Sequence, residues 1–348
     1  MEKTGSTSIQ RLLRDNGAAL RRAGVAYPLA GSNRGNHNLL ALAYIPLDRL
    51  SRGARSARAA WPPGFLDANR AAIMAEIGKH DRVVISGEYL FRLAAGEVGA
   101  LKRDLEAAGV RETRVFGVLR SPASFYLSFV QQTLKGSATF PSPDTFFVPY
   151  SARAAGWLEH FDCAYLEFRT LVDSDLGIVG TFIQQLEQAL GVDLSALPRT
   201  ARLENDSMSP EEMQLVQDFR RQWFPDDDGV LNRPTTRLVD ALRRYRGEGW
   251  RKPILRPEVE ACISERHRKD VEALAALTGV ALAVSPGDTL GGPIMAQQAR
   301  DILANFDEAL HRRLVTRVCP SRYLGFRTRF ANLVRSLRGR AGRATPAV

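Results

Sequence analysis

Short apolar runs of strand length alternate with longer helical patterns through the first half of the chain. In order, the segments are strand-like Arg82–Ser86, helical Ala94–Ala108, strand-like Val115–Leu119, helical from Pro122 to about Leu134, strand-like Cys163–Phe168 and helical Leu176–Leu190. Such alternation is typical of βαβ units, in which crossover helices cover both faces of a parallel sheet. The pattern therefore predicts an α/β fold with a central, mainly parallel sheet in a three-layer core.

The rest of the chain carries helical patterns only. After about residue 200 no strong strand signal recurs, and residues 209–224, 257–279 and 293–314 show helical spacing of apolar side chains. Residues 28–65 are rich in Gly, Asn, Pro and Arg, and we expect an irregular, partly helical insertion there. We expect residues 1–200 to form the α/β core, 201–315 a helical portion of the same domain, and 316–348 a C-terminal tail.

The first residues combine a cation, a glycine and hydroxyls at the start of a predicted helix. The segment reads Glu-Lys-Thr-Gly-Ser-Thr-Ser-Ile-Gln, so that Lys3, Gly5 and the three hydroxyls of Ser6, Thr7 and Ser8 precede an apolar helical stripe. Free N–H groups and the helix dipole both favour an anion at such an end. Lys3 precedes Gly5, which differs from the order in a Walker A motif. The alternative is a flexible terminus with an ordinary helix cap.

A second segment places a cation at the end of a predicted buried strand. Arg120 follows Val115–Leu119, and Ser121-Pro122 is a good start for a helix. Ser121, Ser124 and Ser128 are spaced to share one helix face, so Arg120 and Ser128 can converge on one phosphate. Ligands of open α/β sheets bind at the carboxyl ends of strands. The alternative is a surface arginine and a serine bonded to its own helix.

Together, EKTGSTSIQ and VFGVLRSPASFYLSFVQQ resemble the two nucleotide-binding segments of sulfotransferases that use 3′-phosphoadenosine 5′-phosphosulfate (PAPS). The likeness is closest to bacterial sulfotransferase-like proteins and covers roughly residues 2–200. It implies a P-loop-like core and a 5′-phosphosulfate loop made of Lys3, Thr4, Gly5, Ser6, Thr7 and Ser8. It also implies that Arg120 and Ser128 bind the 3′-phosphate, and that no metal is required. In that family a first strand precedes the loop, but only two residues precede Lys3, so we expect that strand to be missing from this sequence, either because the true start lies upstream, which we favour, or because the chain lacks the strand.

Sulfuryl transfer needs a base that removes the proton of the acceptor. Glu88 lies just after the predicted strand Arg82–Ser86, where the resemblance to carbohydrate sulfotransferases places the base. His37 is the second candidate, because its unperturbed pKa suits proton transfer near neutrality. Each could instead be structural, Glu88 as a cap or ion-pair partner and His37 as an ordinary loop histidine.

The resemblance implies transfer to a hydroxyl, or an amine, of a carbohydrate or lipid-linked glycan. Two other functions stay open. One is a nucleotide-dependent phosphotransferase, which is disfavoured because the Walker A order of residues is absent and no Mg²⁺-binding pair is evident. The other is a catalytically weak nucleotide-binding protein tethered to anionic surfaces.

The net charge of +10 is concentrated at the C-terminal end. Residues 311–348 contain ten arginines and no Lys, Asp or Glu, which leaves 38 basic and 38 acidic residues elsewhere. From Tyr323 to Leu337 an apolar stripe flanked by arginines predicts a basic amphipathic helix. It either docks on the body or binds an anionic membrane surface or polyanion, with nucleic acid the least expected partner. No apolar run reaches the length of a bilayer span, so we expect a soluble, cytoplasmic protein, peripheral to the membrane at most.

Overall fold

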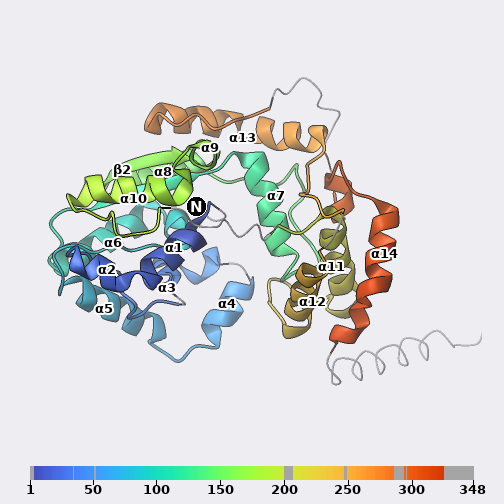
Figure 1. Cartoon of the computed structure of the whole chain (residues 1–348), viewed down its shortest axis with the longest axis horizontal. Helices are drawn as coiled ribbons and strands as arrows, with labels where there is room; N and C mark the ends of the chain where they lie inside the picture. Colours follow the sequence, from blue (N-terminus) through green and yellow to red (C-terminus); the bar gives the residue numbers. More distant parts are fainter. Residues whose placement is uncertain are drawn as a thin grey trace, which may run out of the picture. The chain divides into compact units, whose positions relative to one another are not determined.

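The structure is a computed structural model that describes residues 4–33, 35–50, 52–199, 207–246, 249–285, 294 and 296–324. The chain forms two compact units, and the polypeptide passes between them several times (Figure 1). The first unit contains Met1–Phe125, Phe147–Asn205 and Ile263–Gly287, and the second contains Tyr126–Phe146, Asp206–Cys262 and Asp288–Val348. The predicted helical portion 201–315 is thus divided between the two units.

Two of the predicted strands pair in parallel in the first unit. Strand β1 (Arg114–Leu119) lies beside β2 (Asp162–Glu167), with Arg114 opposite Asp162 and Leu119 opposite Glu167. Gly117 allows the close approach of the Tyr165 ring, because a Cβ at this glycine would lie 2.4 Å from ring carbons. The α/β class and two parallel strands are therefore present, as predicted.

The remaining predicted strand, Arg82–Ser86, forms only an isolated parallel bridge between Val83 and Ala26. The Ala26 N–H donates to the Arg82 carbonyl at 2.8 Å, and the Val84 N–H donates to the Ala26 carbonyl at 2.9 Å. Two such bonds are too few for a ladder. Among the described residues, the broad central sheet of the prediction is a two-stranded sheet beside this bridge.

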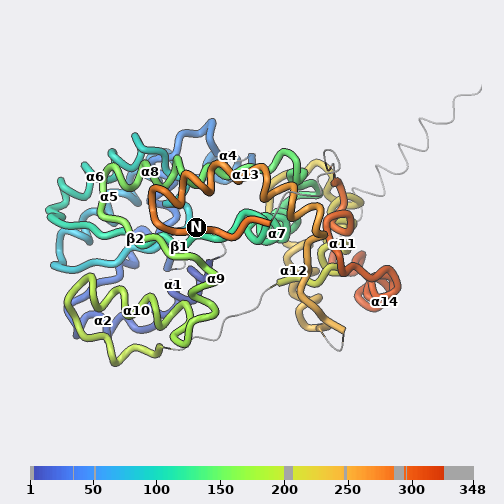
Figure 2. Tube along the Cα trace, turned by 90° about the horizontal axis from the view of Figure 1, so that it is seen from above, coloured from blue at the N-terminus to red at the C-terminus, as the bar shows by residue number. Residues whose placement is uncertain are grey.

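Helices of the first unit lie on both sides of the strands (Figure 2). They are α1 (Ser6–Asp15), α2 (Gly17–Arg22), α3 (Asn38–Tyr44), α4 (Arg52–Ala59), α5 (Phe65–Ile77), α6 (Ala95–Ala107), α8 (Tyr150–Leu158), α9 (Phe168–Asp173) and α10 (Gly177–Leu190), with the short 3₁₀ helices η1 (Leu47–Arg49) and η2 (Glu88–Arg92). One apolar cluster joins α3, α5, α6 and α8, and Val115 of β1 packs against it. A second cluster joins α1, α2, α9 and α10, and Val118 of β1 packs against that one.

The described part of the second unit is helical. It contains α11 (Pro210–Trp223), α12 (Arg233–Arg244) and α14 (Glu308–Val318), with η3 (Ala299–Ile302) and η4 (Pro320–Tyr323). Two helices belong to both units: α7 (Pro122–Thr133) begins in the first, and α13 (Pro257–Thr278) begins in the second. No described helix combines the length and the apolar character that crossing a bilayer requires.

The predicted helix over 293–314 is wrong. Leu303 is extended instead and forms a bridge with Leu255, and the Ala304 N–H donates to the Ile254 carbonyl at 2.9 Å. The helix α14 starts later, where the Asp307 side chain accepts from the Leu310 N–H. The predicted amphipathic helix from Tyr323 to Leu337 lies almost entirely outside the described residues.

Candidate functional site

Helix α1 begins after a glycine whose backbone is in the left-handed region. Gly5 has φ 80° and ψ 5°, and a Cβ there would lie 2.9 Å from Ile178 Cδ1. Both the dihedral angle and the space therefore require glycine. Thr4 is buried, Ser6 and Ser8 are half-buried and Thr7 is exposed. Lys3 lies outside the described residues, so its predicted contact with the phosphosulfate stays a prediction.

The start of α1 has the features of an anion site. The N–H groups of Ser8 and Ile9 donate to the Gly5 carbonyl, at 3.0 and 3.4 Å. The N–H groups of Ser6 and Thr7 have no acceptor within the helix, as at any helix start. The first turn contains no acidic residue, so the positive end of the helix dipole is not neutralised from within α1.

Glu88, the first candidate for the base, meets this loop. Ser6 Oγ donates a hydrogen bond to Glu88 Oε1, across 82 positions of sequence. Beside it, Gln10 Nε2 donates to Ser86 Oγ at 3.3 Å. The start of α1 and the turn Ser86–Glu88 are thus held together by side chains from both segments.

His37 holds the turn Ser86–Glu88 through hydrogen bonds to the backbone of Ser86. Its ring is fully buried, Nδ1 accepts from the Ser86 N–H at 3.1 Å, and Nε2 donates to the Pro28 carbonyl at 2.9 Å. The His37 N–H also donates to the Ser86 carbonyl, and Asn38 Oδ1 accepts from the Tyr89 N–H. Burial lowers the pKa of His37, against the opposing effect of the Pro28 and Ser86 backbone groups. With both ring nitrogens engaged, His37 is placed to position the turn, and Glu88 is the better candidate for the base.

We predict that Gly5→Ala will destabilise the first unit by about 1–3 kcal/mol, since it combines left-handed strain with a clash against Ile178. Gly64→Ala is a matched control. Gly64 also precedes a helix, with φ 73° and ψ 2°, but a Cβ added there would meet no atom within 4 Å. Urea denaturation should show the larger loss for Gly5→Ala, and in an Ile178→Ala background, which removes the clashing atoms, Gly5→Ala should cost less than in the unaltered chain. Equal losses at the two glycines would show that the Ile178 contact is unimportant.

We predict that stability will fall in acid because two buried histidines are neutral in the fold. Burial lowers the pKa of His267 as well, whose Nε2 accepts from the Val148 N–H at 3.0 Å. Below the ordinary pKa of 6.5 the unfolded chain binds protons that the folded chain does not, so unfolding becomes easier as pH falls. Urea midpoints from pH 8 to pH 5 should drop below about 6.5. The urea midpoint of His37→Gln should be lower than that of the unaltered chain at pH 8 but should fall less steeply towards pH 5. Parallel curves for the two proteins would contradict the neutral state of His37 in the fold.

Arg120 is held where β1 ends. Its Nε donates to Ser124 Oγ at 2.6 Å, and its guanidinium lies 4.9 Å from the centre of the Phe168 ring. Tyr150 Oη donates to the Arg120 backbone carbonyl at 3.0 Å. Burial lowers the pKa of Arg120, with Tyr150 acting in the opposite direction, but an arginine remains charged. A half-buried cation thus stands at the carboxyl end of the sheet.

The predicted partner Ser128 lies on the same helix face two turns into α7, and it is half-buried. In this structure Ser124, one turn earlier, receives the Arg120 hydrogen bond. The start of α1 and the end of β1, where Arg120 lies, pack against the same apolar cluster. Ile9 of α1 and Ile178 belong to this cluster, and Val118 of β1 and Phe168 pack against it. Convergence of Arg120 and Ser128 on a phosphate stays a prediction.

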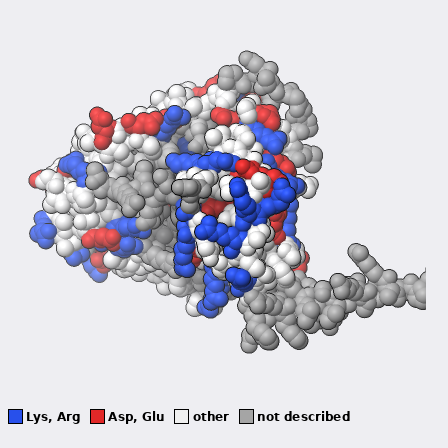
Figure 3. All heavy atoms as spheres, turned by 45° about the vertical axis from the view of Figure 1, so that its right-hand side comes forward, with Lys and Arg blue, Asp and Glu red and all other residues white. Residues whose placement is uncertain are grey.

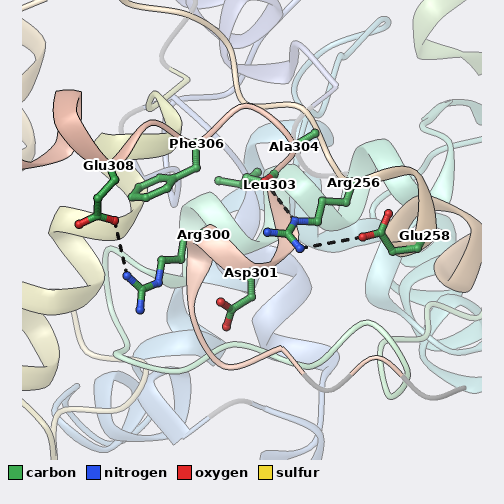
Figure 4. A pocket seen from close by; sticks show the side chains of 8 residues that line it. All are labelled: Arg256, Glu258, Arg300, Asp301, Leu303, Ala304, Phe306 and Glu308. Carbon is green, nitrogen blue, oxygen red and sulfur yellow. Dashed lines mark hydrogen bonds and ion pairs between the residues drawn. The ribbon is translucent and has the colours of Figure 1, made fainter. Parts of the chain in front are cut away.

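A separate hollow of about 530 Å³ lies in the second unit (Figure 4). Its charged side chains are mixed, with Arg256 4.0 Å from Glu258 and Arg300 3.7 Å from Glu308. None of the predicted site residues lines it. Among the described residues, no group of three or more His, Cys, Asp or Glu is arranged to hold a metal ion.

In comparisons with protein-family models, curated proteins and solved structures, no match to this chain was found. The candidate site therefore depends on its own geometry. Sequence reasoning did not find Gln10, Asn38 or Ser86 as supporting residues of this site, and it named Ser124 only as sharing a helix face with Ser128. The only local signal was their position next to predicted site residues.

Proposed function

We propose that this chain is a PAPS-dependent sulfotransferase that transfers a sulfuryl group to a hydroxyl, or an amine, of a carbohydrate or lipid-linked glycan. The observation that carries the proposal is the hydrogen bond between Ser6 and Glu88. It brings the candidate base to the candidate phosphosulfate loop, although the two are far apart in sequence. The acceptor class follows from the sequence resemblance.

The proposed reaction is an in-line displacement at sulfur. The acceptor oxygen forms a bond to sulfur while the bond from sulfur to the phosphate oxygen breaks, and adenosine 3′,5′-bisphosphate leaves. The acceptor proton goes to the Glu88 carboxylate. Lys3 and the N–H groups at the start of α1 stabilise the negative charge that develops on the leaving phosphate. Arg120 binds the 3′-phosphate, with Ser128 as the second contact.

The proposed core is a P-loop-like, three-layer arrangement. In support, Val83 and Ile85 pack against one apolar cluster, while Val84 between them packs against the other. This alternation is that of a strand buried on both faces. Val115 and Val118 of β1 are divided between the clusters in the same way.

Thermal shift and calorimetry with adenosine 3′,5′-bisphosphate test the proposal. We expect the bisphosphate to stabilise the chain more than adenosine 5′-monophosphate, inorganic sulfate, or ATP with Mg²⁺. Transfer from PAPS to a panel of glycans should then be measurable. If only ATP with Mg²⁺ stabilised the chain, the result would favour a phosphotransferase. Bisphosphate binding without transfer to any acceptor would favour a binding protein.

A further inference from the structure

One face of the second unit is strongly basic. The elements α12, α14 and η4 together contain eight arginines and two acidic residues. Seven of the arginines are exposed: Arg233, Arg237, Arg244, Arg312, Arg313, Arg317 and Arg322. Figure 3 turns the side of α11, α12 and α14 toward the viewer, and Lys and Arg atoms gather on it.

Two tyrosines lie among these arginines. Tyr245, directly after α12, is 41% exposed, and the Arg317 guanidinium of α14 lies 5.4 Å from its ring centre. Burial raises the pKa of Tyr323 in η4, Tyr245 raises it further, and Arg322 and Arg244 oppose the shift. We call Arg244, Tyr245, Arg317, Arg322 and Tyr323 the basic face.

The two carboxylates of these elements are directed to other cations. Asp240 Oδ1 lies 3.2 Å from Arg243 Nη1, and Glu308 Oε2 lies 3.7 Å from Arg300 Nη1. The two acidic side chains of α12 and α14 thus contact arginines outside the basic face.

We propose that the basic face docks on an anionic lipid bilayer. Exposed arginines attract the lipid phosphates, and tyrosine is a side chain that favours the membrane–water boundary. The sequence after η4 adds both positive charge and apolar residues. Residues 325–348 contain six arginines and no acidic residue, and Tyr323 is the first member of the apolar stripe that continues in that segment. A charged patch joined to an apolar stripe matches the two signals that stable membrane attachment requires.

The test uses the full chain and sedimentation with vesicles of phosphatidylcholine and phosphatidylserine, against phosphatidylcholine alone. We expect binding to the anionic vesicles only, decreasing with salt. The triple variant Arg244→Ser, Arg317→Ser and Arg322→Ser should bind about 10-fold or more weakly, since each arginine near such a surface contributes substantially. The matched control removes three exposed arginines of the first unit, with Arg21→Ser, Arg22→Ser and Arg55→Ser, and should bind nearly as well as the unaltered chain.

Two outcomes would overturn the proposal. An equal loss in both triple variants would show that net charge alone drives the attachment. No binding to anionic vesicles, with tight binding to dextran sulfate or DNA that the first triple variant loses, would assign the face to a soluble polyanion. The urea midpoint of each variant shows whether it is folded. The test does not involve sulfuryl transfer, so its outcome is separate from that of the proposed activity.

Discussion

Replacing Glu88 by glutamine should lower the rate of sulfuryl transfer about 10²-fold or more, while the affinity for adenosine 3′,5′-bisphosphate stays nearly unchanged. A glutamine amide cannot take the acceptor proton. Its carbonyl oxygen can still accept the hydrogen bond from Ser6 Oγ, so the contact between α1 and the turn is kept. The loss should therefore appear in the turnover number. Single-turnover transfer from PAPS, with calorimetry on the same protein, measures both quantities.

Ser6→Ala separates the base from its support. This change removes the hydroxyl that binds Glu88 but leaves the carboxylate, so we expect a smaller loss of rate and a weaker affinity for the bisphosphate. Unchanged turnover in Glu88→Gln would transfer the base role to water or another side chain. A fall in the free energy of unfolding as large as the kinetic effect would instead make Glu88 a structural residue.

The elements that the sequence predicted well have local signals. Ser209 and Glu212 form a capping box, in which the Ser209 side chain accepts from the Glu212 N–H while the Ser209 N–H donates to Glu212 Oε2 at 2.7 Å. The predicted helix over 209–224 is therefore confirmed as α11 within a residue at each end. Strands β1 and β2 were equally clear, because each is a short apolar run next to turn residues.

The errors occur where distant segments decide the conformation. Residues 303–304 have a helical pattern in sequence, but their backbone pairs with Ile254–Arg256, which no local signal reveals. Arg82–Ser86 has the composition of a strand, yet its one bridge is to Ala26. Both outcomes depend on hydrogen bonds over long sequence separations, which propensity does not encode.

The candidate site shows the same division. Gly5 and the hydroxyls of the loop were visible in sequence because a glycine before a helix is a local feature. The contact between Ser6 and Glu88 was not predicted: the resemblance only named both residues for the site, and the structure brings the two side chains together. The role of His37 could not be read from the sequence, because its neutral, buried state depends on the Pro28 and Ser86 backbone around it. A histidine in a polar loop gives no sign of its burial.

Replacing Arg120 by alanine should weaken binding of adenosine 3′,5′-bisphosphate by about 1.5–3 kcal/mol, because a charged hydrogen bond to the 3′-phosphate is removed. The fold around it should persist. Tyr150 donates to the Arg120 backbone carbonyl, which alanine retains, and the contacts that are lost include those to Ser124 and the Phe168 ring. Arg120→Lys keeps a charge but not the planar fork of donors, so its affinity for the bisphosphate should lie between those of Arg120→Ala and the unaltered chain.

The assignment to the 3′-phosphate is decided by comparing two ligands in calorimetry. Adenosine 5′-monophosphate lacks the 3′-phosphate, so Arg120→Ala should change its affinity little. Ser128→Ala should cost about 1 kcal/mol with the bisphosphate and nothing with the monophosphate, as expected for a neutral hydrogen bond to the same group. Ser124→Ala removes the side chain that holds Arg120 Nε and leaves the cation, so this change should weaken bisphosphate binding less than Arg120→Ala does. If Arg120→Ala weakens both ligands equally, Arg120 acts on the nucleotide as a whole or through the fold, because only a contact with the 3′-phosphate separates the two ligands.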